Sequence, residues 1–216
     1  MVMTVIDKDL IKQDFHQIYY DSEVWGGPTK FLGVPILKNP MDLWMYQELV
    51  SKVKPKIIIE TGTRYGASAA WLMYCQMMNG ITDGMVVTID IEQLVTFKQP
   101  QMTQIIGMST DPRVVYTCID IVGKGDGPVM VILDSDHSKD NVLAELNLYS
   151  KFVTPGSYLI VEDTNVNGNP VYPEHGPGPK EALDEWLPEH MDEFEVDGEC
   201  EKFRLTFNPG GYLRRK

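Results

Sequence analysis

Acidic side chains follow two apolar runs of the sequence, at the points where the runs end. The pairs are Asp134 with Asp136 after residues 129–133, and Glu162 with Asp163 after residues 157–161. If the two runs are neighbouring strands of one sheet, the four carboxylates meet at one edge and raise each other's pKa unless a cation binds them. Oxygen ligands favour Mg²⁺, Mn²⁺ or Ca²⁺ over Zn²⁺. The alternative is that the aspartates only cap the segments that follow them.

One histidine lies among these acids. His137 follows Asp136 directly. Its unperturbed pKa near neutrality suits a base that takes a proton from a hydroxyl whose pKa a metal has lowered. The alternative is a hydrogen bond at the start of the next helix. Asn165 and His175 are the predicted substrate contacts, because the stretch 165–179, rich in Pro and Gly, follows the acids and is placed to cover a substrate.

A cofactor loop is predicted where an earlier apolar run ends. Residues 60–66 read Glu-Thr-Gly-Thr-Arg-Tyr-Gly and precede a helical pattern. Gly62 and Gly66 let the backbone approach a ligand, and the N-terminus of the helix attracts negative charge. The glycine spacing differs from the G-x-G-x-x-G of dinucleotide sites. The acid Glu60 suits a cationic cofactor, S-adenosylmethionine, better than a pyrophosphate. The alternative is an ordinary tight turn.

Two later strand ends extend the predicted cofactor site. Asp90 ends the next apolar strand. A carboxylate there can accept hydrogen bonds from both ribose hydroxyls of a nucleoside. Ser109 follows the third strand and is placed to flank an adenine ring. Together with the loop, these positions predict a cofactor that lies beyond the carboxyl ends of the strands.

The elements that position these residues alternate between strand and helix from Lys56 onward. The predicted strands are residues 57–60, 85–90, 104–106, 129–133 and 157–161, and the predicted helices are residues 67–78, 112–121, 139–149 and 180–187. This pattern predicts an α/β fold with a Rossmann-like, doubly wound, mostly parallel sheet that helices cover on both faces. The chain is expected to close with an antiparallel hairpin of residues 202–207 and 212–214, which is more typical of methyltransferases than of dehydrogenases.

The length and composition indicate the domain organisation and disfavour several classes. The 216 residues divide into an aromatic-rich helical extension, 1–54, that forms a lid or a subunit interface, and one cofactor-binding domain, 55–216. A net charge of −12 disfavours a nucleic-acid partner. No apolar run is long enough for a membrane span, and no secretory leader is expected. Three scattered cysteines indicate reduced thiols in a cytoplasmic protein without a zinc site.

Several stretches resemble the cephalosporin hydroxylase family. They are residues 132–137, 158–168, 176–179 and 205–213, with shorter matches at 31–33 and 38–42. Despite its name, this family resembles class I S-adenosylmethionine-dependent methyltransferases and is similar to sugar and macrolide O-methyltransferases that use Mg²⁺. The resemblance implies an O-methyltransferase acting on a small polyhydroxylated metabolite, such as a sugar, a glycoside or an antibiotic. It also implies a homo-oligomer.

The resemblance also implies roles for individual residues. Glu162 and Asp163 would hold the metal with one aspartate, either Asp134, from the spacing in catechol O-methyltransferases, or Asp136, from the spacing in the closer family. In the catechol enzymes the base stands three residues after the first aspartate, which is His137 here. The implied cofactor contacts are Glu60, Gly62, Thr63, Gly66, Ser68, Asp90, Ser109 and Asp134, with Lys38 directed at the cofactor carboxylate or the substrate.

Two other functions compete with methyl transfer. A non-haem iron hydroxylase would use two histidines and one carboxylate, and His175 would have to join His137. A non-catalytic assembly subunit that keeps the cofactor fold is the other alternative, although intact acids beside His137 argue against it.

Overall fold

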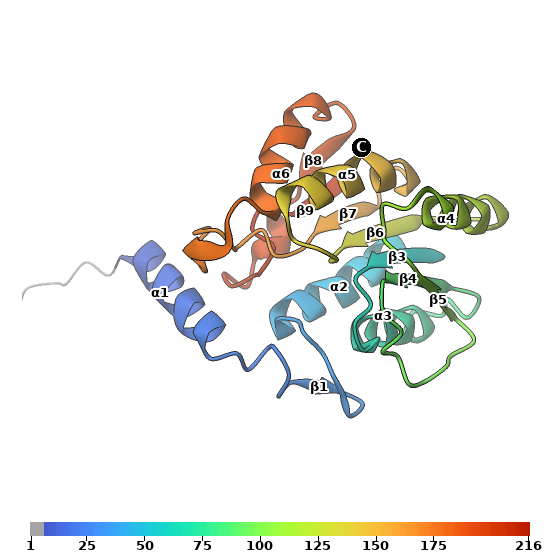
Figure 1. Cartoon of the computed structure of the whole chain (residues 1–216), viewed down its shortest axis with the longest axis horizontal. Coiled ribbons are helices and arrows are strands. Elements are labelled where there is room, and N and C mark those ends of the chain that lie inside the picture. The colour runs from blue at the N-terminus through green and yellow to red at the C-terminus, as the bar shows by residue number, and fades with distance from the viewer. Residues whose placement is uncertain (1–6) are drawn as a thin grey trace, which may run out of the picture.

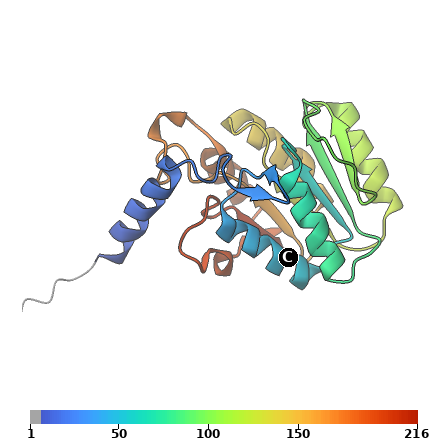
Figure 2. The same cartoon turned by 90° about the horizontal axis from the view of Figure 1, so that it is seen from below.

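A computed structural model describes residues 7–216, so the first six residues of the predicted extension lie outside the described residues. One seven-stranded sheet has helices on both faces (Figures 1 and 2). Its strands are β3 (Ile57–Thr61), β4 (Met85–Asp90), β5 (Met102–Ile106), β6 (Val129–Leu133), β7 (Tyr158–Val161), β8 (Phe194–Val196) and β9 (Tyr212–Arg215). The helices are α1 (Lys8–Asp21), α2 (Pro40–Val53), α3 (Ala67–Met78), α4 (Pro112–Lys124), α5 (Lys139–Tyr149) and α6 (Pro179–Trp186).

The order of the strands creates an open edge for a ligand. The sheet runs β5-β4-β3-β6-β7-β9-β8, with β5 to β7 parallel and β9 antiparallel to both of its neighbours. The chain leaves β3 toward β4 on one side and later returns to β6 on the other. Ligands of open α/β sheets bind at such a switch point, beyond the carboxyl ends of the strands. The predicted fold class is therefore confirmed.

Alternating side chains of the strands supply two hydrophobic layers. Ile58 packs in one layer with α2 and α3, whereas Ile57 and Ile59 pack in the other with α4, α5 and α6. This is the period of two that a strand covered on both faces requires. Helix α2 also contributes buried side chains to this first layer. The predicted division at residue 54 stays a prediction.

The predicted C-terminal hairpin needs one correction. The antiparallel pair is present, but the partner of β9 is β8, and residues 202–207 form no strand. Leu205 and Phe207 are buried, and the backbone amide of Phe207 donates to Asp42 Oδ2 at 2.8 Å instead of to a sheet neighbour. The apolar pattern of this segment thus reflects packing against α2 and not strand pairing.

Helix α1 projects from the body of the molecule (Figures 1 and 2). It contacts the body through His16, which is buried, stacks on Phe207 with ring centroids 5.8 Å apart, and places Nε2 3.0 Å from Asn165 Nδ2. A short ribbon of β1 (Lys30–Phe31) and β2 (Val34–Pro35) then leads to α2. Within residues 7–216, no helix is both long and apolar enough to cross a membrane.

Candidate active site

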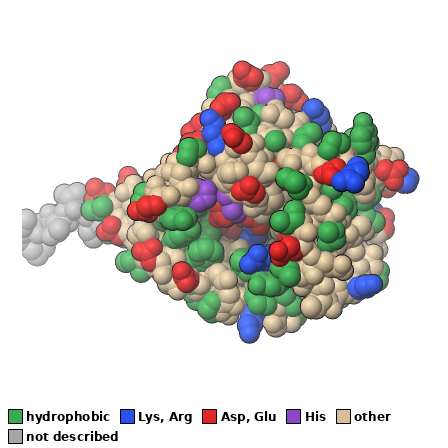
Figure 3. All heavy atoms as spheres, viewed as in Figure 1, with side chains coloured by type: hydrophobic (Ala, Val, Ile, Leu, Met, Phe, Trp, Pro, Cys, Tyr) green, Lys and Arg blue, Asp and Glu red, His purple; other side chains and the backbone are tan. Residues whose placement is uncertain are grey.

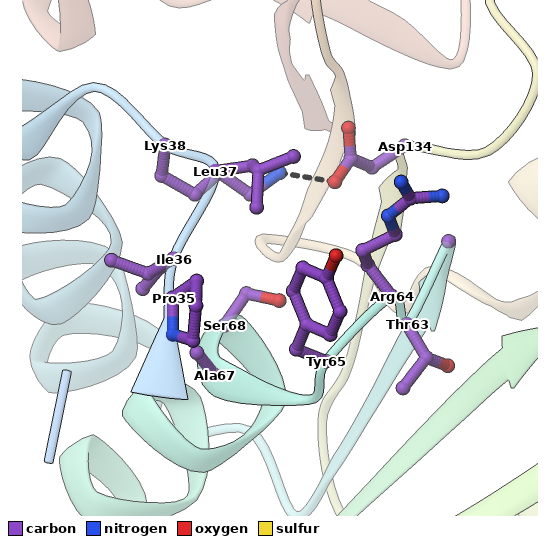
Figure 4. Close-up of a pocket in the computed structure, with 11 residues that line it drawn as sticks. Pro35, Ile36, Leu37, Lys38, Thr63, Arg64, Tyr65, Ala67, Ser68 and Asp134 are labelled. Carbon is purple, nitrogen blue, oxygen red and sulfur yellow. Dashed lines mark hydrogen bonds and ion pairs between the residues drawn. The ribbon is translucent and has the colours of Figure 1, made fainter. Parts of the chain in front are cut away.

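The loops that follow β3, β6 and β7 meet beside the segment that precedes α2. A pocket there is lined by residues 35–38 of that segment, by residues 62–65 with Ala67 and Ser68 after β3, and by Asp134 after β6. Figure 4 shows Lys38 and Asp134 pointing toward each other across this pocket. In the space-filling view, acidic, basic and histidine side chains gather around one hollow (Figure 3). Of the predicted site residues, Lys38, Gly62, Thr63, Ser68 and Asp134 therefore line one pocket.

The loop after β3 is pressed against the end of β6. Gly62 has φ +84°, and a Cβ there would lie 1.8 Å from the carbonyl oxygen of Asp134. Only glycine fits this approach. The backbone amide of Arg64 donates to Asp90 Oδ2 at 2.7 Å, so Asp90 helps to fix the loop. Gly66, with φ +81°, occupies the N-cap position of α3.

Glu60 lies beneath this loop, fully buried. The hydroxyl of Thr88 donates to Glu60 Oε2 at 2.8 Å, and Thr63 Oγ1 lies 2.6 Å from Thr88 Oγ1. The other oxygen, Oε1, has no hydrogen-bond partner among the described residues. Burial raises the pKa of Glu60 to about 7, against the lowering effect of the Lys38 charge. An unpaired buried acceptor favours a donor or a cation close to it.

Lys38 joins the two halves of the site. Its Nζ donates to Asp134 Oδ2 and to Glu162 Oε1, the latter at 2.6 Å. Burial alone would lower the pKa of Lys38, but the charges of Asp134, Glu162 and Glu60 raise it above the ordinary value. Burial and the charges of Glu162 and Asp163 raise the pKa of Asp134, and Lys38 opposes this effect. The clustered carboxylates thus repel one another at this edge of the sheet, and bound cations would relieve that repulsion.

Three residues form the group best suited to a metal. One ligand atom each from Asp134, His137 and Asp163 lies within 4.8 Å of the others. His137 Nε2 is 3.1 Å from Asp163 Oδ2 and 3.9 Å from Asp134 Oδ1. Asp163 has φ +54°, a conformation that non-glycine residues adopt mostly where the surroundings impose it. Its backbone amide donates to Asn208 Oδ1 at 3.0 Å.

Three further residues predicted for the site lie outside the group of Asp134, His137 and Asp163. Asp136 is exposed, and its carboxylate accepts from the backbone amide of Ser138 at 3.0 Å and from its hydroxyl at 3.2 Å, in the turn that precedes α5. Asn165 is fully buried against His16. His175 lies near His137, because a Cβ added to Gly178 would be 3.2 Å from both His137 O and His175 Cε1.

A buried polar network that the sequence did not reveal supports the acids. The hydroxyl of Tyr46 donates to Glu162 Oε1 and accepts from Asn208 Nδ2 at 3.1 Å. Tyr212 donates to Asp42 Oδ1 at 2.9 Å, and burial raises the pKa of Asp42 to about 7. Tyr46 and Asp42 belong to α2, whose apolar periodicity indicated packing only. Nothing in the sequence around Tyr46 and Asp42 indicated that their hydroxyl and carboxyl groups bind the acids or the buried network.

Helix α5 supports the loops that follow β5 and β6 through one polar face. Asn141 donates to the carbonyl of Asp136 at 2.9 Å, and Ser135 donates to Glu145 Oε1 at 2.6 Å. Tyr149 donates to the carbonyl of Ser109 at 2.6 Å. Positions 141, 145 and 149 recur every four residues and therefore share one face of the helix. The loops after β5 and β6 are thus tied to the same helix.

Comparison with known proteins identifies the family. The family described as Rhamnosyl O-methyltransferase/CmcI matches residues 23–216. The chain belongs to this family. The rhamnosyl O-methyltransferase of Mycobacterium tuberculosis (strain ATCC 25618 / H37Rv) is 36% identical over 213 residues, covering 96% of this chain and 86% of the relative. That of Mycobacterium leprae (strain TN) is 37% identical, covering 96% and 92%. Membership makes the chain an S-adenosylmethionine-dependent O-methyltransferase, as the sequence predicted.

Solved structures of the Rhamnosyl O-methyltransferase/CmcI family and beyond share the fold. A structure described as "cmcI-D160 Mg-SAM" has a TM-score of 0.68 and 22% identity, covering 88% of this chain and 77% of its own. The methyltransferase MycE, in complex with Mg, SAH and mycinamycin VI, has a TM-score of 0.56 and 15% identity, covering 90% and 53%. At these identities the likeness extends to the fold alone.

Proposed function

We propose that this chain transfers the methyl group of S-adenosylmethionine to a hydroxyl of a deoxyhexose residue on a small glycoside, with Mg²⁺ or Mn²⁺ bound beside the acceptor. The observation that carries the proposal is the juxtaposition of the Asp134, His137 and Asp163 group with the pocket at residues 62–68. The relatives named as rhamnosyl O-methyltransferases support the choice of sugar.

The cofactor is assigned to the pocket of Figure 4. Gly62 and Thr63 line this pocket, Gly66 begins α3 beside it, and the unpaired Oε1 of Glu60 beneath the loop accepts from the amino group of the cofactor. The ribose and adenine then extend along the strand ends, toward Asp90 and Ser109. Ser68, Lys38 and Asp134 border the amino-acid end.

The donor set fits a hard divalent cation. Asp134 and Asp163 offer oxygens from two neighbouring strand ends, and Glu162 contributes the oxygen that Lys38 and Tyr46 do not hold. Asp134 is the preferred aspartate because it lies in the group with His137 and Asp163, whereas the Asp136 carboxylate accepts from Ser138. When bound, the metal supplies positive charge that lowers the pKa of an acceptor hydroxyl. The group contains one histidine and two acids, which disfavours the two-histidine site of a non-haem iron hydroxylase.

His137 is assigned as the general base. Its Nε2 takes the proton of the acceptor hydroxyl, and the adjacent Asp163 carboxylate stabilises the imidazolium that results. The hydroxyl oxygen then forms a bond to the methyl carbon while the carbon–sulfur bond breaks, and the sulfur keeps the electron pair. Positioning of the hydroxyl in line with that bond supplies much of the rate.

The acceptor is assigned to aromatic rings beside the acids. Tyr20 stacks on Trp25 with centroids 5.1 Å apart and on Tyr172 at 6.5 Å, and Tyr172 meets His175 at 5.5 Å. Burial, with the nearby charge of Asp163, raises the pKa of Tyr20 to about 12. Aromatic walls with a few polar groups are typical of small-molecule sites, and the C–H face of a deoxysugar suits them. The extension and the loop 165–179 thus cover the acceptor.

The test compares two acceptor sugars, one with the C–H face of a deoxysugar and one without it. Purified protein is incubated with S-adenosylmethionine, Mg²⁺ and either an alkyl rhamnoside or an alkyl glucoside, and products are identified by mass spectrometry. We expect a product 14 mass units heavier from the rhamnoside and far less from the glucoside. Equal methylation of both would contradict the choice of deoxysugar, and methylation of neither would contradict the acceptor class.

The cytoplasmic location and the homo-oligomer stay predictions. Leu10, Ile11, Phe15 and Ile18 of α1 are exposed, and an oligomer would cover such an apolar face. Light scattering after size-exclusion chromatography measures the oligomeric state, and a monomer at micromolar concentration would contradict the prediction.

A further inference from the structure

A buried lysine occupies the centre of the acid cluster. The side chain of Lys38 is 4% exposed, and its Nζ bridges Asp134 Oδ2 and Glu162 Oε1, which come from two different strand ends. The next residue, Asn39, fixes the backbone by accepting from the amide of Met41 at 3.1 Å as the N-cap of α2. The lysine is therefore delivered to the acids by a defined backbone segment.

The position of this ammonium conflicts with a metal on the same acids. Asp134 and Glu162 are two of the carboxylates assigned to the cation, and one oxygen of each, Asp134 Oδ2 and Glu162 Oε1, already pairs with the ammonium of Lys38. A divalent cation and an ammonium on the same two carboxylates repel each other strongly in a buried site. Lys38 must therefore move or share its acids when the metal binds.

The cofactor pocket gives the ammonium an alternative partner. Lys38 lines this pocket together with Tyr65 and Ser68 (Figure 4). The amino-acid end of S-adenosylmethionine carries a carboxylate, and this end is assigned to the same wall of the pocket. A buried lysine needs a counter-charge, and that carboxylate supplies one a short side-chain movement away from Asp134.

We propose that Lys38 couples the two halves of the site, an inference that rests on the function proposed above. In the arrangement that the structure shows, its ammonium holds Asp134 and Glu162. When the cofactor is bound, the ammonium pairs with the cofactor carboxylate and leaves both acids to the metal. Cofactor and Mg²⁺ therefore bind with positive cooperativity, and the effect of each on the affinity of the other is equal by linkage.

The first test uses the unaltered protein. Isothermal titration calorimetry measures the Kd of Mg²⁺ alone, with saturating S-adenosylhomocysteine, and with saturating 5′-methylthioadenosine, which has the nucleoside and thioether but no amino-acid carboxylate. We expect S-adenosylhomocysteine to tighten Mg²⁺ binding about fivefold or more, a typical coupling, and 5′-methylthioadenosine to leave it unchanged. Equal effects of both compounds, or of neither, overturn the coupling while leaving the proposed function intact. Absence of binding by both Mg²⁺ and S-adenosylhomocysteine overturns the proposed function itself.

The second test removes the ammonium. In Lys38→Met, Mg²⁺ should bind more tightly than in the unaltered protein when no cofactor is present, and S-adenosylhomocysteine should no longer change that affinity. The matched control is Lys180→Met, whose ion pair with Asp184 lies on the surface of α6 and should leave both affinities unchanged. Weaker Mg²⁺ binding in a folded Lys38→Met protein, with coupling retained, contradicts the proposal. The analogue test remains decisive if this variant does not fold.

Discussion

Removing the hydroxyl of Tyr46 tests whether its hydrogen bond to Glu162 positions that acid for the metal. Tyr46 is 1% exposed, and its hydroxyl donates to Glu162 Oε1 and accepts from Asn208 at 3.1 Å. Tyr46→Phe removes only this oxygen and leaves the ring in its place. Glu162 keeps Lys38 as a partner, but one of its two donors is lost.

The size of the effect follows from the charge of the acceptor. Hydrogen bonds to charged groups contribute about 1.5–3 kcal/mol, which corresponds to roughly 10- to 150-fold in an equilibrium constant. Removing a residue that orients a metal ligand typically weakens metal binding about 10- to 100-fold. Because the backbone amide of Glu162 still donates to the carbonyl of Leu133 at 3.0 Å and keeps the residue in place, we expect the lower end, about tenfold weaker binding of Mg²⁺.

The assay separates metal binding from stability. Calorimetry gives the Kd of Mg²⁺, and urea unfolding in EDTA gives the free energy of unfolding. The matched control is Tyr158→Phe, since Tyr158 is equally buried and donates to Asp197 Oδ2 at 2.6 Å, a residue outside the active site. Both variants should lose stability, and only Tyr46→Phe should lose metal affinity. The reasoning is refuted if the two variants bind Mg²⁺ alike.

Further predictions concern the base, the metal ligand, the loop and α1. His137→Gln should lower kcat by about 10²- to 10⁴-fold with little change in the Kd of S-adenosylhomocysteine, and a fall below tenfold would rule out the assigned base. Asp134→Asn should weaken Mg²⁺ binding in calorimetry, whereas Asp136→Asn should leave that binding unchanged; the reverse result would make Asp136 the ligand. Gly62→Ala should abolish binding of S-adenosylhomocysteine because its Cβ would lie 1.8 Å from Asp134 O, whereas Gly80→Ala, with φ +77° and open space, should leave that binding unchanged. Burial, with the charge of Lys12, lowers the pKa of His16 from 6.5 to about 4. Between these values the unfolded chain binds a proton that the folded chain does not, so acidification from pH 6.5 to 4 should cost up to about 1.4 kcal/mol of stability per pH unit. Thermal unfolding across this range should show a smaller loss in His16→Gln, and equal pH profiles would contradict the assignment.

The sequence predicts the parallel part of the sheet because the signals there are local. Continuous apolar runs gave β4 and β6 with their observed bounds, and helices 67–78 and 139–149 also match. Asp111 caps α4, with Oδ1 accepting from the amide of Arg113 two residues later at 2.8 Å. Each of these features depends on neighbours in the sequence, which a single chain displays directly.

The missed features depend on contacts between distant residues. Tyr46 meets Glu162 across 116 positions of sequence, and Lys38 meets it across 124. The segment 202–207 has the alternation of a strand, but Asp42 binds its backbone and removes it from the sheet. No local pattern distinguishes a buried tyrosine that packs from one that also holds an acid. The acids themselves were predictable because strand ends of a parallel sheet meet at one edge.

One measurement tests the account most directly. Protein dialysed against EDTA is incubated with an alkyl rhamnoside and S-adenosylmethionine labelled in its methyl group, and label in the rhamnoside is counted before and after addition of Mg²⁺. We predict no transfer in EDTA, transfer on addition of Mg²⁺, and none in Asp134→Asn at the same Mg²⁺ concentration. Transfer that is equal with EDTA and with Mg²⁺ would contradict the metal-dependent site at Asp134, His137 and Asp163.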